Sequence, residues 1–305
     1  MKNMLKWVGI VVGGLVALVL LIIVGLLAYG QLSWKPKINR DPVAIVADTS
    51  AEGIARGEYL VTSVMGCADC HSSEPGAPDL AGRYEVLEQG PMRVEFAPPN
   101  LTPHEQTGLG AWTDAEIARA IREGIGRDGR ALVVMPSFNY HVLSDADVAA
   151  IIGYLRSIDP VENEIPPFDA SAAAKTAYAL GMLGPKSVGE PITDVQTTPA
   201  ITSPEYGVYM TTLSGCRDCH GMDFTGNAIP LAEPGTPYAP NLTSHGALGK
   251  WTEAEFIATL RTGTTPNGRT LNEIMPWRVY GQMSDDDLGA IYRYLVSLPL
   301  ESAGQ

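Results

Sequence analysis

The sequence predicts an all-α protein that consists of one apolar N-terminal helix and two copies of a helical domain. An uncharged run extends from Trp7 to Trp34, and a set of short motifs occurs twice in the same order. The apolar residues of the last segment of each copy recur at helical spacing. With 305 residues, the chain is long enough for two small domains and an anchor.

The N-terminal run is long enough to cross a bilayer. Val8 to Leu27 is almost wholly aliphatic, and about 20 apolar residues in helical form span a hydrocarbon core of roughly 30 Å. The alternative is a cleaved signal peptide, since Ala28-Tyr29-Gly30 is a passable cleavage site. The run is longer than the apolar stretch of ~7–15 residues that signal peptides usually carry. We therefore expect a retained anchor over residues 1–34 and a juxtamembrane linker over residues 35–50.

Charge is distributed unevenly along the chain. There are 21 basic and 34 acidic residues, and residues 1–40 contain five of the bases and no acid. The remaining chain is therefore strongly acidic. Such a surface argues against nucleic-acid binding, which requires cationic side chains that neutralise phosphates. It favours partners with basic patches.

All four cysteines lie in two copies of the motif Cys-x-x-Cys-His. This is the spacing of a c-type haem attachment site. Both thiols form thioethers with the haem vinyl groups, and the histidine binds the iron. The sequence therefore predicts two covalently attached haem c groups. The attachment residues are Cys67, Cys70 and His71 in the first copy and Cys216, Cys219 and His220 in the second.

Other uses of these cysteines explain the pattern less well. A thioredoxin-like pair has no need of the following histidine. A single zinc site would require the two motifs to converge although each lies in its own repeat. Disulfides within each pair are geometrically awkward and leave both histidines unused. No cysteine remains for another role.

The haem motifs also predict where the protein resides. Haem is attached to c-type cytochromes on the outer side of the plasma membrane. We therefore expect a single-pass protein of the bacterial inner membrane, with the haem domains on the periplasmic side and the Lys2 and Lys6 end in the cytoplasm.

The two haem motifs belong to an internal duplication. We expect the first domain over residues 51–158 and the second over residues 203–305, joined by a proline-rich linker over residues 159–202. The matched segments are Pro99–Thr102 with Pro240–Thr243, Trp112–Glu116 with Trp251–Glu255, Asp128–Arg130 with Asn267–Arg269, Met135–Pro136 with Met275–Pro276, and Leu143–Asp147 with Met283–Asp287.

Each copy is expected to form a few short helices. A capping box predicts the middle helix, and a serine before a helical-period apolar stripe predicts the last one. We expect a further helix around residues 51–65 and 203–214 and one in the linker near residues 169–183. The first copy has an extra loop near residues 84–95. The capping residues are Thr113 with Glu116, Thr252 with Glu255, Ser144 and Ser284.

Met135 and Met275 are the candidates for the sixth iron ligand. Both occupy the same repeat position and precede a proline, which cannot continue a helix and fixes the loop. A thioether ligand raises the reduction potential relative to a second imidazole. The alternatives are that these methionines simply fill the core, or that the paired His104 and His245 bind the irons instead.

Further residues are predicted to support the haems. The Pro78 carbonyl is a candidate to fix the ring of His71 from behind. Two matched arginines either pair with haem propionates or are surface turn residues. Two matched tryptophans either touch a haem edge or serve as hydrophobic staples. These residues are Arg130, Arg269, Trp112 and Trp251.

Taken in order, these motifs resemble class I cytochrome c domains. In particular, they resemble those in membrane-bound cytochrome subunits of bacterial alcohol, aldehyde and gluconate dehydrogenases. The resemblance covers roughly residues 51–158 and 203–299. It implies two tandem all-α class I cytochrome c domains, each with helices around its haem and one haem edge exposed. The chain differs from those subunits in having two haem domains where three are common, and in His104 and His245, where an acid often stands.

We expect an electron carrier rather than an enzyme, because both irons are predicted to be fully ligated and no acid–base or nucleophile group surrounds them. The expected partners are redox proteins: a periplasmic dehydrogenase, a quinol-oxidising complex, a terminal oxidase or a soluble cytochrome. No small-molecule substrate is expected. The alternatives are an integral cytochrome c subunit of a respiratory complex or oxidase, and a dihaem peroxidase, which needs one iron with an open position.

Overall fold

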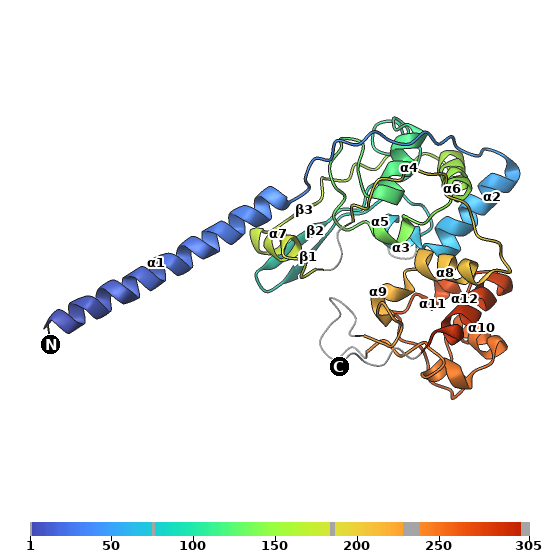
Figure 1. Cartoon of the computed structure of the whole chain (residues 1–305). Coiled ribbons are helices and arrows are strands. Elements are labelled where there is room, and N and C mark those ends of the chain that lie inside the picture. Colours follow the sequence, from blue (N-terminus) through green and yellow to red (C-terminus); the bar gives the residue numbers. More distant parts are fainter. Residues whose placement is uncertain (1, 75–76, 184–186, 228–237, 300–305) are drawn as a thin grey trace.

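The computed structural model describes residues 2–74, 77–183, 187–227 and 238–299. In this part of the chain, a long N-terminal helix leads into two helical domains and a small sheet (Figure 1). The predicted end of the second domain at residue 305 lies outside the described residues.

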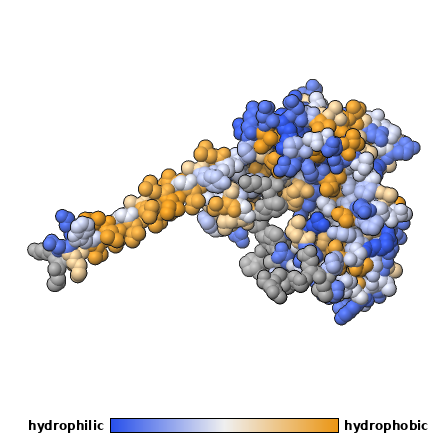
Figure 2. All heavy atoms as spheres, in the orientation of Figure 1, coloured by the Kyte–Doolittle hydropathy of each residue, from blue (hydrophilic) through white to orange (hydrophobic). Residues whose placement is uncertain are grey.

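The N-terminal helix α1, Lys2–Ser33, projects away from the rest of the molecule (Figure 1). Its segment Asn3–Ser33 is long and apolar enough to cross a membrane. Figure 2 shows apolar surface along this helix, whereas the two domains present a largely hydrophilic surface. A water-exposed helix of this composition would be strongly unfavourable, because its whole apolar surface would remain hydrated.

The C-terminal end of α1 packs against α7, Ala172–Ala179, which is the helix expected in the linker. The two helices approach closely: a Cβ added at Gly30 would lie 2.7 Å from the Cα of Thr176. Trp34 then stacks on Phe168 at 5.5 Å between ring centroids and meets the edge of Tyr178 at 5.7 Å. The end of α1 and Trp34 are therefore packed against the segment between the two domains.

Residues 35–48 form a strap along the first domain. The Ile38 N–H donates to the Gly129 carbonyl at 2.7 Å, and the Asp48 N–H donates to the Ala149 carbonyl at 2.9 Å. Arg40 forms an ion pair with the buried Glu123. These contacts span the domain, so the segment expected to be a linker is fixed to the domain surface.

The helices of the two domains repeat in the same order. The predicted capping boxes at Thr113 and Thr252 and the predicted serine caps at Ser144 and Ser284 are confirmed. The first domain contains α2 (Ala51–Tyr59), the π-helical turn η1 (Leu60–Val64), α3 (Cys67–His71), α4 (Asp114–Glu123), α5 (Ser137–Tyr140) and α6 (Asp145–Ser157). The second contains α8 (Pro204–Leu213), α9 (Cys216–His220), the 3₁₀ turn η2 (Ala247–Lys250), α10 (Glu253–Thr262), α11 (Trp277–Tyr280) and α12 (Asp285–Ser297).

A glycine allows the first and last helices of each domain to cross at close range. A Cβ at Gly57 on α2 would lie 2.0 Å from the Ala150 carbonyl oxygen of α6, and a Cβ at Gly207 on α8 would lie 2.6 Å from that of Ala290 on α12. Contacts this short exclude any side chain. In each domain, this crossing brings the apolar stripe of the last helix into the core, where the stripe is buried.

The extra loop of the first domain forms a β-hairpin, which the all-α expectation does not include. Its strands β1 (Glu85–Gln89) and β2 (Met92–Phe96) pair antiparallel around Gly90, whose φ of +57° suits a tight turn. The short strand β3 (Asp169–Ala170) joins β2 from the linker, with Val94 opposite Ala170. The sheet thus connects the linker and α7 to the first domain.

The two domains contact each other through two equivalent tyrosines. Each lies two residues after the crossing glycine and binds the N-terminus of the last helix of the other domain. Tyr59 donates to Asp287 and accepts from the Ser284 N–H at 2.9 Å. Tyr209 donates to Asp147 at 2.5 Å and accepts from the Ser144 N–H at 3.2 Å. The interface is therefore approximately two-fold symmetric, as expected for two copies of one unit.

The two aspartates of this interface differ in their second partner. Asp147 also binds Arg56 of its own domain, through contacts of 2.8 and 3.1 Å. Asp287 instead accepts from the Tyr206 hydroxyl at 2.7 Å. One buried carboxylate therefore has a guanidinium beside it, whereas the other is bound by two hydroxyls.

Candidate functional site

In the first domain, the predicted haem residues come together around one cavity of about 500 Å³. Cys67, Cys70 and His71 reach it from α3, and Met135 reaches it from the loop before α5. The cavity wall is predominantly apolar and is formed by the helices on either side, with Leu109, Ile117, Ile121, Ile151 and Leu155 among its residues.

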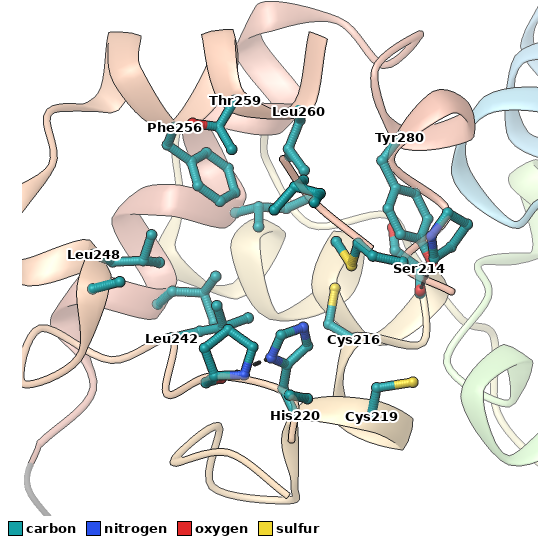
Figure 3. A pocket seen from close by; sticks show the side chains of 18 of the residues that line it. Ser214, Cys216, Cys219, His220, Leu242, Leu248, Phe256, Thr259, Leu260 and Tyr280 are labelled. Carbon is teal, nitrogen blue, oxygen red and sulfur yellow. Dashed lines mark hydrogen bonds between the residues drawn. The ribbon is translucent and has the colours of Figure 1, made fainter. Parts of the chain in front are cut away.

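The second domain repeats the arrangement around a cavity of about 390 Å³. Cys216, Cys219, His220 and Met275 line it. Figure 3 shows the His220 ring and the Cys216 sulfur directed toward this space, with Leu242, Leu248, Phe256 and Leu260 around it. Pocket volumes of this order are typical of small-molecule and cofactor sites.

The two histidines are oriented by main-chain carbonyls. The His71 Nδ1 lies 2.8 Å from the Pro99 oxygen, and the His220 Nδ1 lies 2.8 Å from the Pro240 oxygen (Figure 3). A carbonyl can only accept, so Nδ1 carries the proton and Nε2 keeps its lone pair for a metal. The prediction that Pro78 plays this part is wrong. The carbonyl comes from the residue before the Asn-Leu-Thr segment, which folds back over the haem motif.

The Asn-Leu-Thr segment holds that carbonyl in place. The Asn100 side-chain oxygen accepts from the Thr102 N–H at 2.9 Å and from its hydroxyl at 2.7 Å. Asn241 and Thr243 repeat both contacts at 2.7 and 2.8 Å. These are short turns closed by a side chain. The motif therefore acts on the site indirectly, through the position of the proline carbonyl behind the histidine.

Burial controls protonation at both sites. It lowers the pKa of His71 and His220, and their carbonyl partners oppose this shift. The neutral imidazole is the form that binds a metal. Burial also raises the pKa of the Cys67 and Cys216 thiols to about 12. None of the four cysteines is in a disulfide, so all four are available to bind haem.

Several supporting predictions can be compared with the cavity linings. Arg130 and Trp112 line the first cavity, and Arg269 and Trp251 line the second. The rival ligands are placed differently. His104 accepts from the Thr107 N–H at 3.2 Å, and His245 lies 3.3 Å from the Ser244 hydroxyl. Neither histidine is among the described residues that line these two cavities.

Some site residues have no signal in the sequence motifs. Lys35 and Phe168, which come from the strap and the linker, line the first cavity. Tyr280 lines the second and donates to the Ser214 carbonyl at 2.5 Å. Its counterpart Tyr140 is buried, and burial raises the pKa of both phenols well above the usual value. Contacts from distant segments leave no periodic pattern in the sequence. The one signal that could have identified the tyrosines is their shared position, five residues after Met135 and Met275.

The residues present fit haem c and fit a shared metal site poorly. Each cavity joins apolar walls to two thiols, one oriented imidazole and one thioether, which is the donor set of a c-type haem. No group of three or more His, Cys, Asp or Glu side chains suited to a metal ion occurs in the described part of the chain. The shared zinc site considered from the sequence thus gains no support from the fold.

Family comparisons agree with this assignment. The family described as cytochrome c oxidase, cbb3-type, subunit III matches residues 52–155, and the family described as cytochrome c matches residues 207–299. Each match contains one Cys-x-x-Cys-His motif. The second match contains every residue that lines its cavity, and the first contains all but Lys35 and Phe168.

Curated proteins similar to this chain carry related names. The chain is 29% identical over 276 residues to the cytochrome c subunit of alcohol dehydrogenase (quinone) from Gluconobacter oxydans strain 621H, covering 83% of this chain and 56% of that protein. It is 28% identical to the gluconate 2-dehydrogenase cytochrome c subunit of Pantoea cypripedii, covering 86% and 64%. It is 27% identical to a diheme cytochrome c-type protein of Cereibacter sphaeroides, covering 80% and 86%.

The chain therefore spans little more than half the length of the alcohol dehydrogenase subunits that it matches. The family matches, the paired cavities and the diheme relative agree on cofactor and domain type. This chain is a c-type cytochrome, with two cytochrome c domains and two covalently attached haem c groups.

Proposed function

We propose that this chain relays single electrons between a redox donor and an acceptor while tethered to the outer face of a bacterial inner membrane. The observation that carries the proposal is the donor set of each cavity. A histidine held by a carbonyl and a methionine line each cavity, and together they would leave no position on a bound iron for a substrate. A haem with six ligands exchanges electrons with little rearrangement, and this favours a carrier over an enzyme.

The residue assignments form part of this proposal. Cys67 and Cys70 would hold the first haem covalently, and His71 and Met135 would bind its iron. Cys216, Cys219, His220 and Met275 would do the same for the second. When bound, the haem supplies the one-electron chemistry. The protein keeps the imidazole neutral, excludes water with apolar walls and fixes both ligand loops.

The proposed architecture is two tandem class I cytochrome c domains, with residues 51–158 and 203–305 as the domains and 159–202 as the linker. The contact between α1 and α7 supports retention of the anchor. Cleavage after Gly30 would remove the helix that packs on Thr176 and leave that face of α7 exposed. Attachment of haem outside the plasma membrane then places both domains on the periplasmic side.

The proposed partners are proteins rather than small molecules. Relatives named as dehydrogenase cytochrome subunits suggest a periplasmic dehydrogenase as donor, and a quinol-oxidising complex is the other source considered. An oxidase or a soluble cytochrome is the proposed acceptor. The acidic chain, with 34 acidic against 21 basic residues, would steer toward basic docking surfaces on those proteins.

Electron uptake by the purified full-length chain in mild detergent tests the proposal. Titration with a one-electron reductant should reduce two haems per chain, and the reduced protein should pass both electrons to a soluble cytochrome c. Hydrogen peroxide should be turned over no faster than by the Met-ligated soluble cytochrome used as acceptor. Rapid peroxide turnover would instead identify a dihaem peroxidase.

A fixed subunit of a larger complex is the second candidate. The match of the first domain to an oxidase subunit family favours it, and so do the names of the dehydrogenase subunits. Affinity purification from native membranes in mild detergent separates the two cases. Other subunits in fixed ratio would indicate a complex, whereas the chain alone would indicate a tethered carrier.

A further inference from the structure

Lys35, at the base of the membrane anchor, lines the cavity of the first domain. It follows α1 by two residues, and its backbone has a φ of +47°. This is the left-handed region, which non-glycine residues rarely adopt unless the surroundings enforce it. The chain therefore turns sharply at this point and sends the lysine toward the cavity rather than along the strap.

Neighbouring contacts fix the position of this lysine. Its ammonium donates to the Phe168 carbonyl and lies 5.0 Å from the centroid of the Phe168 ring. The strap continues with the Ala131 N–H donating to the Pro36 carbonyl at 3.0 Å and with a β-bridge between Lys37 and Arg130. Lys35 is thus held against the turn that carries Arg130, which also lines the cavity.

The acidic groups near Lys35 already have other cations. Asp169 pairs with Lys175 at 2.9 Å, and Asp128 lies 3.5 Å from Arg130. Burial lowers the pKa of Lys35, although Asp169 and Asp128 act in the opposite direction. A partly buried ammonium beside an apolar cavity gains most from an anionic partner inside that cavity.

In the described part of the second domain, no lysine lines the cavity. Its cavity is lined by residues between Ser214 and Leu295 only, and Arg269 is the lining residue equivalent to Arg130. Within the described residues, Lys35 is therefore a cation at the first haem site with no counterpart at the second. The difference exists because the strap that carries Lys35 packs on the first domain.

We propose that Lys35 binds a propionate of the first haem c, so that the base of the membrane anchor forms part of the first haem site. The propionates are the anionic groups of haem c, and an ammonium at the cavity wall beside Arg130 matches them in charge. A fixed positive charge stabilises the reduced haem, so Lys35 raises the reduction potential of the first haem. The inference rests on the proposed attachment of that haem at Cys67 and Cys70.

Redox titration of Lys35→Met in the full-length, detergent-solubilised chain tests this proposal. One of the two midpoint potentials should fall by about 59 mV, which corresponds to a tenfold change in the one-electron equilibrium constant. The other should not change. The shifted haem should be the one whose titration also changes in Met135→Ala. The haem content should stay at two per chain.

Matched variants separate the role of Lys35 from a general charge effect. Lys37→Met removes the same charge two residues along, at an exposed position, and should leave both potentials unchanged. Lys35→Arg keeps the charge, so the potential of its first haem should stay close to that of the native chain. If Lys35→Met loses the first haem, Lys35→Gln is titrated instead and must show the same fall.

Two unchanged potentials in Lys35→Met, or a shift no larger than that of Lys37→Met, would overturn the role of Lys35. That result would leave the two haem assignments intact, because the haem content is measured separately. A native chain without haem at Cys67 and Cys70 would instead reject the proposed function from which the inference starts.

Discussion

Replacement of Tyr59 by phenylalanine tests how the two cytochrome domains are held together. The substitution keeps the ring but removes the hydroxyl that donates to Asp287 and accepts from the Ser284 N–H at 2.9 Å. A hydrogen bond to a charged group contributes about 1.5–3 kcal/mol, and loss of a partner leaves a buried polar group unsatisfied. We therefore expect Tyr59→Phe to lower the free energy of unfolding by about 2–3 kcal/mol.

The equivalent substitution in the other domain should cost less. Tyr209→Phe also removes a hydroxyl from a buried aspartate, but Asp147 keeps the Arg56 guanidinium at 2.8 and 3.1 Å. Asp287, in contrast, would keep the Tyr206 hydroxyl as its side-chain partner. An anion that retains a cation loses less when one donor is removed. The expected loss for Tyr209→Phe is about 1–2 kcal/mol.

Chemical denaturation of the haem-loaded protein in detergent, followed by far-ultraviolet circular dichroism and by haem absorbance, gives both losses. Tyr84→Phe is the control, because Tyr84 is 43% exposed near the hairpin; it should change the unfolding free energy by no more than about 0.5 kcal/mol. A loss of that small size for Tyr59→Phe would refute the reasoning. A larger loss for Tyr209→Phe than for Tyr59→Phe would refute the argument from Arg56.

Three further outcomes follow from named contacts. Burial and the Asp287 contact raise the pKa of Tyr59 from 10.0 to about 12. The free energy of unfolding that this shift contributes below pH 10 should therefore be lost as the pH rises toward 12. Tyr59→Phe should lose less free energy of unfolding over the same pH range in the same denaturation assay. Gly207→Ala should destabilise the second domain by about 1–3 kcal/mol, because its Cβ would meet an α12 carbonyl at 2.6 Å, whereas Val208→Ala on the exposed side should cost under about 1 kcal/mol. Met135→Ala and Met275→Ala should each remove about half of the far-red sulfur-to-iron absorption band; an undiminished band in either variant would reject that ligand.

Local sequence signals account for most of the helical framework. The capping boxes at Thr113 and Thr252 involve residues three positions apart, so their pattern is complete within one turn. The same holds for the serine caps at Ser144 and Ser284. The haem motif is also local, because the two thiols and the histidine lie within five residues. Such features can be read from a single sequence.

Features that depend on distant contacts could not be predicted in this way. The carbonyl behind His71 comes from Pro99, 28 residues along the chain, and the nearer Pro78 was an incorrect choice. Lys35 reaches the first cavity only because the strap packs on the domain. The hairpin over residues 85–96 carries the glycine and β-branched residues of a turn and strands, but its partner strand lies 73 or more residues away.

The interface between the domains also had no sequence signal of its own. Tyr59 and Tyr209 occupy the same position relative to the crossing glycines Gly57 and Gly207, yet they lie at different distances from their haem motifs. The π-helical turn η1 accommodates the one extra residue of the first copy. An alignment anchored on the cysteines places these tyrosines out of register, so the symmetry becomes visible only in the fold.

The number of haems bound per chain tests the central claim most directly. Mass spectrometry of the intact chain, together with a pyridine haemochrome assay, should give two covalently bound haems for the native protein and one for the double variant Cys67→Ala, Cys70→Ala. A native chain whose mass lacks added haem, or a double variant that still carries two, would contradict the assignment of one haem c to each cavity.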